Sequence, residues 1–291
     1  MLLSEDHLAV QDAVRAYVQD RIAPQAAEWD RSKHFPKAEL RGLAALGCYG
    51  VAVPTEYDGA GLDYLALSII LEEIAAGDGA TSTVVSVNNC PVCSILMAFG
   101  NEQQKQRFLK PLARGDMLGA FCLTEPHVGS EAGGLKTSAV RDGDHYVLNG
   151  VKQFITSGKN GDLAIVMAVT DKAAGKKGIS AFVVPTDTPG YIVARVEDKM
   201  GQHASDTAQI LFDNCRVSAA NLLGEEGMGL KIALSGLEGG RIGIASQAIG
   251  IARAAYEATL VYVKDRKAFG AAIGTFQMTQ SKIADMKCKL E

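Results

Sequence analysis

The stretch that decides the fold is Cys122-Leu123-Thr124-Glu125-Pro126-His127-Val128-Gly129-Ser130-Glu131-Ala132-Gly133-Gly134. It stands where a helical sequence pattern gives way to a β-rich one. A strand end followed by a Gly/Ser loop offers hydroxyls and unpaired backbone N–H groups to an anionic or heteroaromatic ligand. Composition alone allows an Ω-type connector between domains equally well. The residues on either side are needed to decide between a binding loop and a connector.

The pattern before this stretch is helical from residue 4 to about 112. An apolar stripe with helical spacing and several Pro and Gly interruptions support this assignment. The stripe includes Val10, Val14, Tyr17 and Val18, and the interruptions fall at Pro24, Gly47, Pro54 and Gly100. The first third is therefore predicted to be mainly α.

The pattern after the stretch is β-rich and then helical again. Runs at 165–169 and 179–184 predict strands, and Asn149-Gly150 predicts a tight hairpin. A long helix is expected from about 227 to 266, and another from near Thr275. Small residues concentrated at 239–250 predict close helix packing.

A second polar and aromatic stretch, Lys152-Gln153-Phe154-Ile155-Thr156-Ser157-Gly158, follows the predicted hairpin. It places an aromatic ring beside two hydroxyls. Taken alone, it is an amphipathic strand.

Composition excludes several classes of function. The 291 residues are 47% apolar and 21% charged, and the formal charge of −4 is spread along the chain. Without a basic block, nucleic acid is disfavoured as a partner. We expect no signal peptide and no membrane span, because no apolar run reaches roughly 20 residues. Six cysteines are too sparse for a disulfide framework. These features predict a reducing, intracellular compartment. The location we expect is the bacterial cytoplasm, with the mitochondrial matrix, for a mature mitochondrial protein, as the alternative.

Common catalytic motifs are missing from the sequence. There is no Gly-x-Gly-x-x-Gly after a strand, no Walker loop and no Gly-x-Ser-x-Gly. Cys90-Pro91-Val92-Cys93 lacks a second cysteine pair, so we interpret its cysteines as buried helix thiols. The five histidines are scattered, and no metal site is predicted.

Taken together, on an α-β-α pattern, the segments resemble the acyl-CoA dehydrogenase family, most closely its short-chain (butyryl-CoA) branch. The likeness runs from the first helix to the last residue. Further matching stretches, in family order, are Pro54 to Asp63, Glu72-Glu73-Ile74, Gly100 to Lys105, and Asp265 to Gly270 with Gln277.

The resemblance implies an α+β fold in three parts. These are a helical N-terminal domain over 1–115, a central, β-barrel-like domain over 116–224, and the start of a C-terminal four-helix bundle over 225–291. FAD would lie extended between the β-domain and the bundles of two subunits. The implied assembly is therefore a homo-oligomer, as a dimer of dimers.

The resemblance also implies site residues, position by position. Leu123 and Thr124 would contact the flavin ring, and Gly129 and Ser130 would lie near the cofactor and the acyl-CoA. The remaining cofactor residues would be Phe154, Thr156 and Ser157 on the other side of the flavin, with Arg266, Phe269 and Gln277 reaching the FAD of the neighbouring subunit. Glu238 and Arg241, together with Ser130, would contact the substrate. The chain departs from the commonest family pattern at Val128, Glu131, Phe154 and Ala268.

The family removes a proton next to the thioester with a glutamate. Most members carry this base beyond the last helix seen here, and a minority carry it one residue before the arginine that matches Arg241. That position is Gly240. The base is therefore expected beyond Glu291, in a chain that is truncated within its bundle.

The implied reaction is dehydrogenation of an acyl-CoA to the trans-2-enoyl-CoA, with electrons passed to an electron-transfer flavoprotein. Thr83 to Met97 would border the acyl pocket and contains no Lys or Arg, which favours a short, uncharged acyl group. The alternatives are a flavin oxidase on the same scaffold and a catalytically incomplete fragment with a binding or assembly role.

Overall fold

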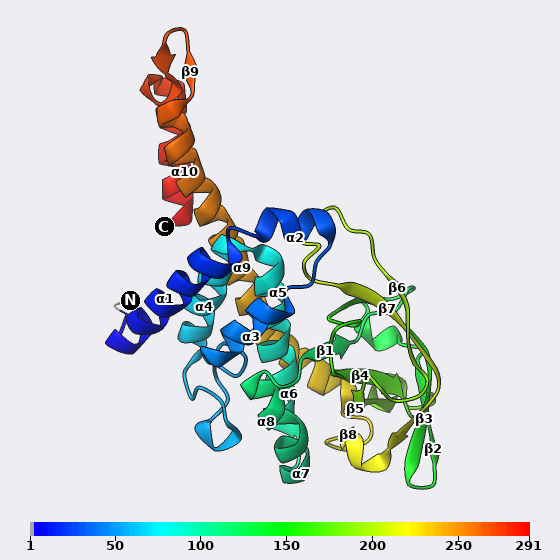
Figure 1. Ribbon diagram of the computed structural model, residues 1–291. Helices are drawn as coiled ribbons and strands as arrows, with labels where there is room; N and C mark the ends of the chain where they lie inside the picture. Colours follow the sequence, from blue (N-terminus) through cyan, green and yellow to red (C-terminus); the bar gives the residue numbers. More distant parts are fainter. Residues whose placement is uncertain (1–2) are drawn as a thin grey trace.

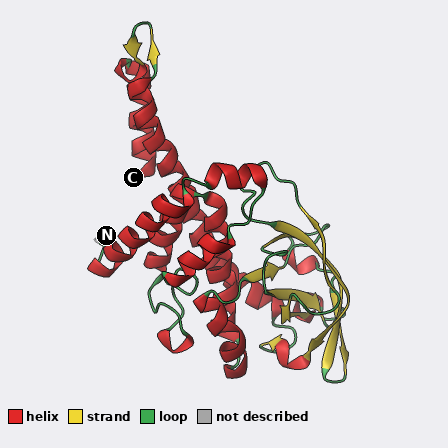
Figure 2. Ribbon diagram, in the orientation of Figure 1, coloured by secondary structure: helices red, strands yellow, loops and turns green. Residues whose placement is uncertain are grey.

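The structure is a computed structural model that describes residues 3–291. Most of the helices gather on one side of the molecule and the large sheet lies on the other, while two short strands stand at the tip of a helical arm (Figure 2). The N-terminal helices are α1 (Glu5–Tyr17), α2 (Ala26–Ser32), α3 (Lys37–Ala45), α4 (Tyr64–Gly77), α5 (Gly79–Val87), α6 (Ser94–Phe99), α7 (Glu102–Gln104) and α8 (Lys110–Arg114). Short π-helical segments, η1 (Val18–Ile22), η3 (Asn88–Cys93) and η4 (Lys105–Leu109), join some of them.

Polar side chains fix where these helices begin. Ser4 accepts a hydrogen bond from the backbone N–H of His7 at the start of α1, Asp63 caps α4, and Asp78 caps α5. Each cap satisfies an N–H group that has no partner inside its helix.

One buried carboxylate joins three helices. Glu73 of α4 lies 2.7 Å from Arg15 of α1 and 2.8 Å from Arg253 of α9 (Gly229–Asp265). Burial alone would raise the pKa of Glu73, but the two guanidinium groups outweigh it and hold the pKa below its usual value. The ion cluster therefore ties the N-terminal helices to α9.

Strands β1 to β8 form one eight-stranded sheet in the order β6-β7-β3-β2-β4-β5-β8, with β1 parallel to β4. Their bounds are β1 (Gly119–Cys122), β2 (Ser138–Asp142), β3 (His145–Thr156), β4 (Leu163–Val169), β5 (Ile179–Pro185), β6 (Tyr191–Val196), β7 (Thr207–Ser218) and β8 (Leu222–Leu223). The predicted runs at 165–169 and 179–184 are β4 and β5. Both are almost wholly buried, which explains why they read as continuous apolar runs.

The expected barrel is not closed. Within residues 3–291, β6 and β8 stand at the two ends of the sheet and do not pair with each other. The end strand β8 has only two residues, and β2 contacts β4 through the single pair Ser138 and Val169. The central domain is thus an open, bent sheet.

The hairpin predicted at Asn149-Gly150 is wrong. Both residues lie inside β3, where the register against β7 shifts between Leu148 and Gly150. Gly150 has φ of 151°, and a Cβ there would come within 2.4 Å of Thr137 Oγ1. The glycine therefore serves a bulge and a close backbone approach. The hairpin turn lies instead at Gly143, between β2 and β3.

The long helix α9 links the two halves of the fold. It begins beside the sheet, passes along α4 and α5, and then projects from the body with α10 (Gln277–Leu290) as an arm (Figure 1). The short strands β9 (Lys267–Ala268) and β10 (Ala271–Ala272) form the tip of this arm. Small residues allow the close packing predicted for 239–250: a Cβ at Gly250 would lie 2.2 Å from the carbonyl oxygen of Glu72.

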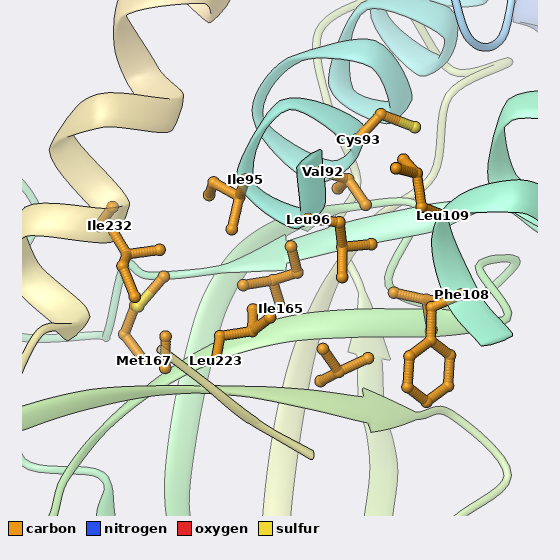
Figure 3. Packing of buried hydrophobic residues seen from close by; sticks show 14 of the residues in the cluster. Val92, Cys93, Ile95, Leu96, Phe108, Leu109, Ile165, Met167, Leu223 and Ile232 are labelled. Atoms are coloured by element: carbon orange, nitrogen blue, oxygen red, sulfur yellow. The ribbon is translucent and has the colours of Figure 1, made fainter. Parts of the chain in front are cut away.

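The largest apolar core lies between the helices and the sheet. Side chains from η3 and α6, from β4 and from α9 point toward one another (Figure 3). Val92, Leu96, Ile165, Met167 and Ile232 are all fully buried there. This core fixes the position of α9 relative to the sheet.

One helical stretch, Gly79–Phe99, is long and apolar enough to cross a membrane by length and composition alone. The expectation that no such run exists was therefore too strict. Because 61% of its apolar window is buried inside the protein, the stretch has the character of a core helix.

Candidate functional site

A pocket of about 500 Å³ opens where the sheet meets the helices, and we call it the central pocket. Its volume lies in the range typical of small-molecule sites. The sheet side contributes Phe121, Leu123, Thr124, Gly129, Phe154, Ile155 and Thr156. The helical side contributes Thr83, Ser86, Val87, Cys90, Pro91, Leu237, Gly240, Arg241, Ile244 and Gln247.

The segment from Leu123 to Glu125 is held against β3. The backbone N–H of Gln153 donates to the carbonyl oxygen of Thr124 at 2.8 Å. The Lys152 ammonium donates to the carbonyl oxygen of Leu123 at 3.1 Å. These bonds fix the backbone of the loop that carries Thr124 into the central pocket.

A buried ion pair supports this segment from behind. Lys152 Nζ lies 2.9 Å from Glu125 Oε1, and Glu125 also accepts the backbone N–H groups of Lys136 and Thr137. Burial raises the pKa of Glu125, but the Lys152 charge and these hydrogen bonds outweigh it and keep the pKa below its usual value. Burial also lowers the pKa of Lys152, and Glu125 offsets this only in part.

A β-bulge aims Phe154 at the pocket. The register of β3 against β7 shifts between Lys152 and Ile155, so Phe154 is left outside the ladder, with φ of 59°. The residue is 63% exposed and lines the central pocket. Bulges commonly redirect a side chain in this way. The result is an aromatic face beside the Thr156 hydroxyl.

Gln247 orders the helical side. Its side-chain amide donates to the carbonyl oxygen of Gly79 and, at 2.6 Å, to Thr83 Oγ1. These contacts join α9 to the start of α5 at the pocket wall. Sequence reasoning did not single out Gln247, because it lies within a helical run of small and apolar residues with no motif of its own.

The structure brings together many of the predicted site residues. Leu123, Thr124, Gly129, Phe154, Thr156 and Arg241 all line the central pocket. Ser130 and Ser157 each follow a lining residue in the sequence, Gly129 and Thr156, but do not themselves line the pocket. Ser157 is fully buried, and its Oγ has no hydrogen-bond partner among the described residues.

Other predicted residues lie away from the central pocket. Glu238 lines a separate recess at the start of α9. Arg266, Phe269 and Gln277 lie on the projecting arm, where all three are exposed. Their predicted contact with a neighbouring subunit's cofactor stays a prediction.

The chemistry available in the central pocket is limited. Of residues 3–291, the ones that line it include no Asp, Glu or His, and Gly240 presents no side chain. Burial raises the pKa of the Cys90 thiol, which disfavours a thiolate nucleophile. The pocket is therefore suited to hold a flat, largely apolar ring with hydroxyls at its edges.

Cys90 and Cys93 are both buried and free, in agreement with their interpretation as helix thiols. Over the same described residues, no group of three or more His, Cys, Asp or Glu side chains is arranged to hold a metal ion.

Sequence comparison matches three family models along the chain. The N-terminal domain of acyl-CoA dehydrogenase matches residues 4–116, the middle domain 120–215 and the C-terminal domain 227–291.

Individual relatives agree with these matches. The short-chain specific acyl-CoA dehydrogenase of Rattus norvegicus mitochondria is 45% identical over 99% of this chain and 70% of its own length. The butyryl-CoA dehydrogenase structure from Megasphaera elsdenii is 39% identical, with a TM-score of 0.95, covering 100% of this chain and 77% of that one. A chain from the structure described as the electron transferring flavoprotein of Acidaminococcus fermentans is 42% identical, with a TM-score of 0.97, covering 100% and 76%.

Proposed function

This chain belongs to the acyl-CoA dehydrogenase family, and from that premise we propose that it oxidises a short-chain acyl-CoA to the trans-2-enoyl-CoA. The cofactor would be FAD, and the electrons would pass to an electron-transferring flavoprotein. The observation that carries the proposal is the central pocket, because it combines Thr124, Phe154 and Thr156 from the sheet with Cys90 and Arg241 from the helices.

The residues present fit a flavin. Leu123, Phe154 and Ile155 would supply apolar surface for a flat ring, and the hydroxyls of Thr124 and Thr156 would be available to hydrogen-bond its polar atoms. A bound flavin supplies the capacity to accept a hydride. The chain would hold the ring through the loop that the Lys152–Glu125 pair anchors to β3.

The substrate would enter from the helical side. Thr83, Ser86, Val87 and Cys90 line that wall without a cationic side chain, so a distal carboxylate on the acyl group would be buried without a partner there. Short, uncharged acyl groups are therefore favoured. We propose that Ser130, Glu238 and Arg241 contact the CoA-bearing part of the substrate.

The catalytic base stays unassigned within residues 3–291, because none of the described residues at the central pocket is a carboxylate. The predicted domain boundaries, between residues 115 and 116 and between residues 224 and 225, also stay a prediction.

Arg266, Phe269 and Gln277 are proposed to reach the FAD of another subunit, which requires a homo-oligomer. We propose a cytoplasmic location by analogy with the bacterial relative from Clostridium acetobutylicum. The mitochondrial relatives make the mitochondrial matrix the alternative.

The test is identification of the flavin and of its oxidant. The purified full-length protein should release FAD on denaturation, and butyryl-CoA should bleach it without oxygen. The reduced protein should then reoxidise slowly in air and rapidly with an electron-transferring flavoprotein. Rapid reoxidation in air would identify an oxidase, and release of NAD or of no cofactor would refute the proposal.

A further inference from the structure

A smaller recess of about 240 Å³ adjoins the central pocket, and we call it the rear recess. Its residues come from the chain before α4, from α4 itself, from η3 and from α6. None of their side chains is charged. They are Ala52, Val53, Tyr64, Leu67, Asn89, Cys90, Cys93, Ser94, Met97 and Ala98.

The rear recess presents a largely apolar surface, because its amide and its aliphatic hydroxyl are already bonded within the protein. The Asn89 side chain accepts the backbone N–H of Val51 at 2.9 Å and donates to the carbonyl oxygen of Cys48 at 2.8 Å. The Ser94 hydroxyl donates to the carbonyl oxygen of Pro91 at 3.1 Å. The recess is therefore suited to a hydrocarbon group.

One side chain separates the two spaces. Among residues 3–291, Cys90 alone lines both the central pocket and the rear recess. Its Sγ lies 4.0 Å from Tyr64 Oη. A Cβ at Gly239 would come within 2.8 Å of the same sulfur and within 3.5 Å of the Tyr64 ring. The thiol therefore fills the gap between Tyr64 and the backbone of α9.

The sequence sets Cys90 in this position through the proline that follows it. A residue before proline is disfavoured in the helical conformation. Cys90 accordingly has φ of −137° and ψ of 114°, an extended conformation within the helical segment η3. The extended backbone interrupts the helical direction of the side chains at this residue. The hydrogen bonds of Asn89 hold the backbone beside it in place.

We propose that Cys90 is a specificity-determining residue, whose side chain limits the length of the acyl group by closing the central pocket off from the rear recess. A smaller side chain at this position joins the two spaces and admits a longer hydrocarbon chain. This inference rests on the proposed function, in which the acyl group lies against the wall that includes Cys90.

The test compares Cys90→Gly and Cys90→Ala with two controls, in the full-length protein with its flavin bound. Cys90→Ser keeps a side chain of similar size, and Cys93→Ala removes a thiol that lines only the rear recess. Calorimetry gives Kd for S-butyl-CoA and for S-octyl-CoA. These thioethers lack the carbonyl that makes the neighbouring C–H acidic, so they report binding without reaction.

We expect the affinity for S-octyl-CoA relative to S-butyl-CoA to rise about 10- to 100-fold in Cys90→Gly, because each additional buried methylene changes Kd by roughly three- to fourfold. Cys90→Ala should show a smaller rise, because its Cβ still narrows the opening, and it carries the test if Cys90→Gly does not fold. Cys90→Ser and Cys93→Ala should keep the wild-type ratio.

An unchanged ratio in Cys90→Gly and Cys90→Ala, in proteins that still bind S-butyl-CoA, would overturn the inference. An equal rise in Cys93→Ala would overturn it too, because it would show a general loosening of η3 in place of the removal of a partition. The proposed function fails separately, if butyryl-CoA does not reduce the flavin of the wild-type protein.

Discussion

Lys152 Nζ lies 2.9 Å from Glu125 Oε1, and both side chains are buried directly behind the loop that carries Thr124 into the central pocket. The pair joins the two sequence stretches that imply a flavin site. Lys152 also donates to the carbonyl oxygen of Leu123, so the pair orders the backbone on which Thr124 stands.

Lys152→Met should destabilise the fold by about 3–5 kcal/mol, because it leaves the Glu125 carboxylate buried without its partner. The double variant K152M/E125Q should recover part of the loss, since no uncompensated charge remains. Denaturant unfolding of both proteins measures the difference. Equal stability of K152M and the wild type would show that the pair does not hold the loop.

Acid should weaken the protein through Glu73. The folded pKa of Glu73 is lowered by Arg15 and Arg253 against the effect of burial, so the unfolded chain binds its proton more readily. The stabilising contribution is complete above the ordinary glutamate pKa of about 4.3 and is lost as the pH falls through the lowered folded value. Unfolding free energies measured between about pH 3 and pH 7 test this.

Glu72 is the matched control for this prediction. Burial raises its pKa, so its effect on acid stability has the opposite sign. Glu73→Gln should flatten the loss of stability in acid, whereas Glu72→Gln should not. If Glu72→Gln flattened the curve equally, the assignment to Glu73 would be wrong.

Two glycines of α9 should respond to alanine in opposite ways. A Cβ at Gly240 meets only the Cys90 carbonyl oxygen, at 3.7 Å, so Gly240→Ala should stabilise the helix by about 0.5–1 kcal/mol. Gly250→Ala should destabilise by about 1–3 kcal/mol, because its Cβ would lie 2.2 Å from the Glu72 carbonyl oxygen. Thermal unfolding compares them, and the same sign in both variants would contradict the packing described.

Flavin retention should depend on Thr124 and Arg266 in different ways. Thr124→Val should lower retention by removing a hydroxyl from the central pocket. Arg266→Ala should loosen FAD with little effect on the unfolding of each subunit, because the side chain is exposed on the arm. Flavin content after gel filtration gives both results. A stable monomer with full flavin occupancy would exclude the shared-cofactor arrangement.

Much of the fold could be predicted from local sequence patterns. The apolar runs that became β4 and β5 are buried on both faces. The long helical pattern became α9 because no proline interrupts it, although its glycines lower its helix propensity. Asn149-Gly150 gave a wrong hairpin prediction, because the pairing of β3 with β7 overrides its local turn preference. In that pairing, the Asn149 side chain accepts a hydrogen bond from the backbone N–H of Asn214. Such a contact between distant segments has no local signature.

In the candidate site, too, residues in local motifs could be predicted, whereas contacts between distant segments could not. Thr124 and Phe154 stand in recognisable stretches and line the central pocket. The Lys152–Glu125 pair lies in the same stretches, but its formation depends on how β3 lies against the loop, which the sequence does not specify.

The most direct test of the central claim is anaerobic bleaching of the flavin in the full-length protein by butyryl-, octanoyl-, isovaleryl- and glutaryl-CoA at equal concentration. The short, uncharged wall formed by Thr83, Ser86, Val87 and Cys90 predicts that butyryl-CoA bleaches fastest. Faster bleaching by octanoyl- or glutaryl-CoA would contradict the substrate assignment. Absence of bleaching by all four would contradict the assignment of acyl-CoA dehydrogenase activity itself.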